Sequence, residues 1–255
     1  MKKITFCAAV IAALVMLFGT LNAQSEYGKA AAAEGNEGKV VGSALQTMPE
    51  TAPRAEGFVP EHWKIFDRAD GDLNGDGVTD TAMILAINEK DTKYVEKLKK
   101  MSENETWYEG LNMIVVVDSR MDGKLHFDTV NYKIGEMPGG ALDEFKVSIK
   151  KHVLDVLINS GGQLRIMETY HFRGDGPNGT GFLTLIGYDE DHYPETVTND
   201  ASTKYSFSEN YLTNTRIDTT FKMGKVGYVV GTEKRTKINP SKVLFEQATS
   251  KFDDK

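Results

Sequence analysis

The feature that most constrains this chain is a run of acidic, amide and glycine residues that leads directly into an apolar segment. Side chains with oxygen atoms fall at alternating positions of this run, at Asp72, Asn74, Asp76 and Asp80. Residues 82–87 then read Ala-Met-Ile-Leu-Ala-Ile. Ca²⁺ takes about 6–8 oxygen ligands, so a loop that wraps it needs alternate residues pointing inward. Gly75 and Gly77 permit the backbone angles of the sharp turn that such a loop requires.

The spacing follows an EF-hand loop up to its ninth position and then departs from it. The Val78 carbonyl falls where an EF-hand has its seventh-position ligand, but Met83 stands where the bidentate glutamate should be. Asp80 must therefore close the site, and we expect a strand to follow it instead of a helix. The sequence predicts a Ca²⁺ site with these ligands: Asp72, Asn74, Asp76, Val78 and Asp80.

Clusters of Asp, Asn and Gly also form ordinary turns, because Asx side chains hydrogen-bond their own backbone. A plain turn has little need of four such side chains in strict alternation, and crowded carboxylates repel one another without a cation. We therefore favour calcium binding, with a structural role for the ion.

Residues 71–85 read Gly-Asp-Leu-Asn-Gly-Asp-Gly-Val-Thr-Asp-Thr-Ala-Met-Ile-Leu, which resembles the calcium loops of FG-GAP and VCBS-type repeats. In that family the pattern D-x-[DN]-x-D-G-x-x-D precedes a hydrophobic strand, and its acidic and amide oxygens bind Ca²⁺. The resemblance implies the same ligand set as above. The pattern occurs once here, whereas a propeller needs several stacked repeats. Residues 182–188 and 208–213 are similar to secreted bacterial proteins that carry one such loop in a β-rich domain.

The first 23 residues have the pattern of a secretory signal peptide. Lys2 and Lys3 precede an apolar stretch, and Leu-Asn-Ala at 21–23 is a cleavage site. The only cysteine, Cys7, lies inside this segment, so the mature chain has no thiol for a disulfide. Residues 24–57 contain Ala, Gly, Ser, Glu and Pro with a single aromatic residue, and we interpret them as a flexible tether. Residues 58–255 would form one β-rich domain.

The charge of the chain argues against nucleic acid as a partner. Without Lys2 and Lys3, 28 basic residues stand against 37 acidic ones, which gives the mature chain a net charge of −9. Nucleic-acid-binding proteins usually carry a basic patch, and none is apparent in the sequence. No later segment has the roughly 20 apolar residues that a membrane-spanning helix requires.

Short apolar and alternating segments separated by turns predict an antiparallel sandwich or a strongly curved sheet. Residues 91–101 carry Tyr94, Leu98 and Met101 at helical spacing, so we expect one early helix with Asp91 as its N-cap. The predicted class is α+β, predominantly antiparallel β.

Other candidate sites have weaker patterns. The histidines show no pair at helical metal spacing, and we interpret them as structural: His62, His126, His152, His171 and His192. Residues 189–192, Asp-Glu-Asp-His, follow a predicted strand and are interpreted as a solvated acidic loop, with an extra metal ligand as the alternative.

These observations predict an exported calcium-binding, non-catalytic module of the cell envelope whose partner is an envelope or extracellular protein or a glycan. The periplasm, the cell surface and the medium all remain open as its location. The alternative is a secreted hydrolase of glycans or peptides with a structural calcium. Paired carboxylates for such a reaction are set by the fold, so Glu136, Glu144 and Glu168 are its candidates.

Overall fold

The structure is a computed structural model that describes residues 35–103, 106–120, 122–134, 142–160, 165–174, 183–193 and 204–249. The predicted signal peptide lies outside the described residues. Two antiparallel sheets make up most of the described chain, and two α-helices precede or interrupt the first sheet. The expected class, β-rich α+β with predominantly antiparallel strands, is confirmed.

The first sheet, sheet A, has five strands in the spatial order β1-β5-β4-β3-β2. Its strands are β1 (Thr51–Ala52), β2 (Trp63–Gly71), β3 (Asp80–Ile87), β4 (Asn112–Ser119) and β5 (Leu125–Asn131). The helices α2 (Gly35–Thr47) and α3 (Thr92–Lys99) accompany it, together with short 3₁₀ segments η1 (Ala55–Phe58) and η2 (Trp107–Gly110).

The second sheet, sheet B, is a meander in which every strand pairs with its neighbours in sequence, in the order β12 to β6. Its strands are β6 (Leu142–Lys150), β7 (Val153–Ser160), β8 (Arg165–Gly174), β9 (Leu183–Tyr193), β10 (Lys204–Asn210), β11 (Thr215–Gly224) and β12 (Gly227–Lys237). A short 3₁₀ segment, η3 (Phe245–Gln247), follows β12.

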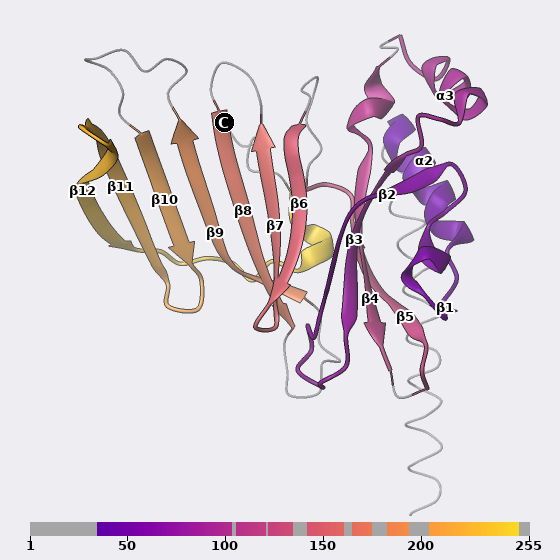
Figure 1. The fold of residues 1–255 in the computed structure, drawn as a ribbon, viewed down its shortest axis with the longest axis horizontal. Helices are drawn as coiled ribbons and strands as arrows, with labels where there is room; N and C mark the ends of the chain where they lie inside the picture. The colour runs from indigo at the N-terminus through magenta and orange to yellow at the C-terminus, as the bar shows by residue number, and fades with distance from the viewer. Residues whose placement is uncertain are drawn as a thin grey trace, which may run out of the picture.

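Sheet A separates two hydrophobic cores. Figure 1 shows the helices on the outer face of sheet A and sheet B on the side of its other face. Because side chains alternate along a strand, β3 serves both cores: Met83 and Leu85 pack with α2 and α3, whereas Ala82 and Ile84 pack with sheet B. A strand buried on both faces reads as a continuous apolar run, as residues 82–87 do.

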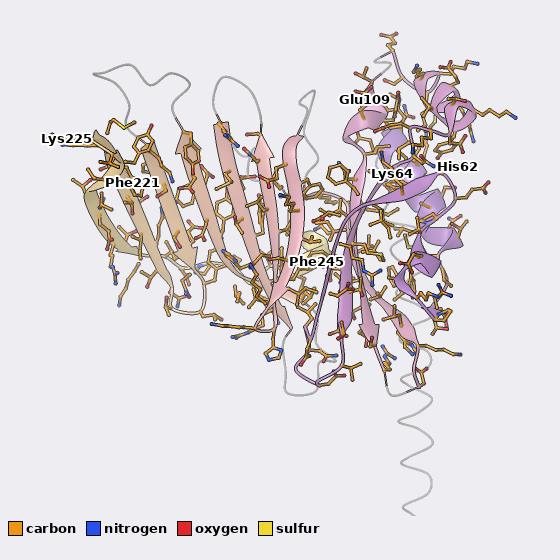
Figure 2. The ribbon with its side chains drawn as sticks, viewed as in Figure 1. His62, Lys64, Glu109, Phe221, Lys225 and Phe245 are labelled. Atoms are coloured by element: carbon orange, nitrogen blue, oxygen red, sulfur yellow. The ribbon has the colours of Figure 1, made fainter. Side chains whose placement is uncertain are left out.

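The C-terminal segment fills the junction between the sheets. Phe245 is fully buried and makes an edge-on contact with Phe172 of β8, with ring centroids 4.9 Å apart. The Asn131 side chain at the end of β5 donates to the carbonyl oxygens of Phe245 and Ala248. Figure 2 shows Phe245 between the two sheets, so this segment ties sheet A to sheet B.

The expectation of a flexible tether is wrong from residue 35 onward. Residues 35–47 form α2, whose Val41 and Leu45 side chains are buried against sheet A. Gly38 and Gly42 are buried as well, so the helix approaches the sheet through small residues. The segment has a low content of large apolar residues, and this explains why its composition resembled that of a linker.

The expected helix at residues 91–101 is confirmed as α3, although it is shorter than expected. The Asp91 carboxylate accepts a hydrogen bond from the Tyr94 backbone N–H, which is the geometry of an N-cap. Leu98 is fully buried and Tyr94 packs at the edge of the same core.

We predict that Leu45→Ala lowers the free energy of unfolding by about 2–4 kcal/mol, because it removes a buried side chain and leaves a cavity. The adjacent Gln46 is exposed, and Gln46→Ala should change the stability little. Urea denaturation followed by circular dichroism measures both. Equal stability of the two variants would mean that α2 is not packed on sheet A.

Candidate metal centre

The loop that the sequence predicts to bind calcium connects β2 to β3, and Gly71 and Asp80 pair across its base. Leu73 is the buried residue of the loop, and it joins the core between the two sheets. Gly75 and Gly77 have φ angles of +81° and +84°, in the left-handed region that favours glycine. The sharp turn that the sequence required is therefore present.

Asp80, the first residue of β3, has the most constrained carboxylate of the loop. Its side chain is 1% exposed. Oδ2 accepts the backbone N–H of Leu73 at 2.8 Å, and Oδ1 accepts that of Ser119 on β4 at 2.9 Å. Burial raises the pKa of Asp80 above its ordinary value and the Asp76 charge adds to this rise, while the backbone N–H groups oppose it.

The other oxygen-bearing side chains fold the loop back on itself. Asp72 accepts the backbone N–H groups of Gly75 at 2.7 Å and Gly77 at 3.0 Å. The Asn74 side chain accepts the N–H of Asp76 at 3.0 Å. Asp76 in turn accepts the N–H of Val78 at 2.7 Å. Each of the four predicted side-chain ligands thus accepts hydrogen bonds from the backbone of the loop.

These residues have the chemistry that a hard cation requires, although they are not gathered into a metal-holding cluster. Among the described residues, no three His, Cys, Asp or Glu side chains are placed so as to hold a metal ion. Each carboxylate oxygen has two lone pairs, so an oxygen that accepts one N–H can also bind a cation. The carboxylates of Asp72, Asp76 and Asp80 would have to move closer together to do so.

The turn between β6 and β7 contacts this loop from sheet B. His152 Nδ1 donates a hydrogen bond to the Asp72 carbonyl oxygen at 2.8 Å and lies 3.7 Å from Asp72 Oδ2. Lys151 and His152 both have positive φ angles, +52° and +63°, as the central residues of a type I′ turn must. In the described part of the chain, His152 is the only basic side chain in ion-pair contact with the loop carboxylates.

His171 lies between two carboxylates on the face of sheet B that points away from its hydrophobic core. Its Nδ1 is 2.6 Å from Asp155 on β7, and its Nε2 is 3.0 Å from Asp189 on β9. These two hydrogen bonds raise the pKa of His171 to about 9, against the smaller effect of burial. The imidazolium therefore links three neighbouring strands, as expected of a structural histidine.

Residues 189–192 form the last part of β9, so the expectation of a solvated acidic loop is wrong. Glu190 is 2% exposed and pairs across the sheet with Glu168, which is 1% exposed. The Tyr188 hydroxyl contacts a carboxyl oxygen of each glutamate, and His192 contacts Glu190 as well. Tyr188 has one hydroxyl hydrogen, so it can donate to only one of the two carboxyl groups. The Tyr170 hydroxyl also lies 3.3 Å from Glu168, so tyrosine hydroxyls contact both buried carboxyl groups.

The glutamates considered for hydrolysis do not form a pair. Phe145, Ile158 and Glu168 lie in register across β6, β7 and β8 and share one face of sheet B. Glu144 precedes Phe145 and so lies on the opposite face, where it pairs with Lys146. Glu136 lies outside the described residues.

Comparisons with known proteins add no family assignment. No family profile matches the chain, and no curated protein or solved structure is significantly similar to it. The residues of the site therefore have to be interpreted from their own chemistry and geometry.

The raised pKa of His171 predicts a pH-dependent stability. Its contribution is fully present below the ordinary pKa of about 6.5 and is lost as the pH rises through about 9. The corresponding loss is roughly 2 kcal/mol after allowance for the partial exposure of the cluster. Urea denaturation from pH 6.5 to 10 measures it, with His171→Gln as the reference. A wild-type protein whose pH profile parallels that of His171→Gln would contradict this assignment.

Proposed function

We propose that the protein is an exported calcium-binding module of the cell envelope that binds a partner and has no catalytic role of its own. The loop between β2 and β3 is the observation that carries this proposal. It combines three carboxylates and an amide, and among the described residues the exposed His152 is the one basic side chain in contact with them. Bound Ca²⁺ would be held by these residues: Asp72, Asn74, Asp76, Asp80 and the Val78 carbonyl.

The ion would neutralise carboxylates that repel one another and would fix the entry into β3. Calcium sites of extracellular modules have dissociation constants of about 10⁻⁴–10⁻³ M, which suits an exported protein. The basic and apolar pattern of residues 1–23 supports export. No helix in the described part of the chain is long and apolar enough to cross a membrane.

The binding module is preferred to the hydrolase because an acid–base pair must reach its substrate. Glu144 and Glu168 lie on opposite faces of sheet B, and Glu168 is buried with Glu190. An envelope or extracellular protein or glycan would be the partner.

Thermal unfolding in EGTA and in millimolar Ca²⁺ tests the calcium site. A ligand at 100 times its dissociation constant stabilises the folded state by about 2.7 kcal/mol. For a chain of this size we expect a rise of roughly 5–10 °C in Tm at that ratio. Asp76→Ala should abolish the rise, because it removes one of the predicted ligands. Among the described residues the Asp76 side chain accepts only the Val78 N–H, so its loss should disturb the fold little.

Asp122→Ala is the matched control, since Asp122 is an exposed aspartate in the turn between β4 and β5 that also accepts a backbone N–H. It should respond to Ca²⁺ as the wild-type protein does. No Ca²⁺ response in the wild-type protein, or an equal response in Asp76→Ala, would show that the loop is an ordinary turn.

A further inference from the structure

We propose that the outer edge of β12 binds an extended acidic polypeptide, which adds to sheet B as a further antiparallel strand. This polypeptide would be the partner of the binding module proposed above, so the inference rests on that proposal. It concerns a different part of the molecule from the calcium loop, because β12 is the far edge of sheet B in Figure 1. Strand addition and calcium binding can therefore fail independently.

The two edges of sheet B differ in how they are covered. The β6 edge lies against β2, where the Asp67 carboxylate accepts the Val147 backbone N–H at 2.9 Å. Gly71 is so close to Ile149 that a Cβ on it would lie 2.7 Å from the Ile149 side chain. On the opposite side, no strand among the described residues pairs with the outer edge of β12. An exposed edge of this kind presents backbone N–H and C=O groups to a further strand.

The β11–β12 hairpin extends beyond the hydrophobic cores. None of the 11 residues of β12 is buried, and Val229 and Val230 are 55% and 62% exposed. Val226 in the turn is fully exposed, and Met223 near the end of β11 is 41% exposed. A strand pair without a packed face gains little stability from burial. A further strand would cover part of this apolar surface.

The positive charge of the β11–β12 hairpin favours an acidic partner. Residues 215–237 contain six basic and two acidic residues, a net charge of +4, whereas the whole chain has a net charge of −7. The rest of the chain therefore has a net charge of −11. Figure 2 shows Lys225 at the outer end of this hairpin, remote from Phe245 in the core. An acidic strand would complement this local charge.

The order of residues along β12 also defines the orientation of the partner. Tyr228, Val229 and Val230 make its first half apolar. In its second half Lys234, Arg235 and Lys237 outnumber Glu233, which pairs with Arg235. An antiparallel partner would place acidic residues in its own first half and apolar residues in its second. A second copy of the chain is disfavoured, because pairing of two β12 edges would bring together two hairpins of charge +4.

The test uses a fluorescent decapeptide with alternating Glu and Thr in its first half and alternating Val and Thr in its second. Anisotropy at low ionic strength should show binding, and the peptide of reversed sequence should bind more weakly. N-methylation of alternate peptide nitrogens should weaken binding about tenfold or more, because it removes backbone hydrogen bonds while keeping the charge. Equal binding of the methylated peptide would overturn strand addition.

Protein variants test the surface itself. The triple variant Lys234→Gln, Arg235→Gln and Lys237→Gln should bind the decapeptide at least about tenfold more weakly, since it removes three exposed charge contacts. Its Tm should stay unchanged, because these side chains are exposed.

The matched control removes three lysines of α3 and the residue after it, with Lys97→Gln, Lys99→Gln and Lys100→Gln. It changes the net charge equally and should bind like the wild-type protein. Three results would each overturn the proposal: no binding of the decapeptide, equal loss in both triple variants, or a dimer in light scattering that the β12 variant abolishes.

Discussion

The hydrogen bonds of the buried Asp80 carboxylate hold together the loop, the central strand and its neighbour. This one group accepts N–H donors from Leu73 and Asn74 of its own loop and from Ser119 of β4. It therefore fixes where β3 begins and how the loop closes. Because β3 contributes to the cores on both faces of sheet A, a displacement of Asp80 would disturb the packing of both cores.

The loop also lies where the two sheets meet, as Figure 1 shows at the turn between β6 and β7. His152 reaches the loop from this turn at the expense of left-handed backbone angles at two non-glycine residues, each costing about 1–2 kcal/mol. A cation in the loop would act at this junction, whereas no described strand pairs with the opposite edge of sheet B. One edge of the sheet is thus held by contacts within the molecule, and the other is the edge at which we propose that a partner strand adds.

The sequence predicted what local chemistry determines. The apolar run after Asp80, the glycine-dependent turn and the Asp91 cap all follow from residues close together in the chain. Helix α2 was missed because Gly38 and Gly42 lower its apolar content, and its burial depends on sheet A. Glu190 was placed in solvent because residues 189–192 were interpreted as a loop, whereas β9 continues through them. Its contacts with Tyr188 and His192 then follow from i, i±2 spacing on one face of the strand.

The most direct measurement is amide hydrogen exchange of the protein with and without Ca²⁺, followed by mass spectrometry. If the ion organises the loop and the junction behind it, protection should rise in residues 72–80 and in the turn at 150–153, while β12 stays unchanged. Unchanged exchange in residues 72–80 at saturating Ca²⁺ would contradict the account. Protection confined to those residues would show that the loop binds the ion without acting on sheet B.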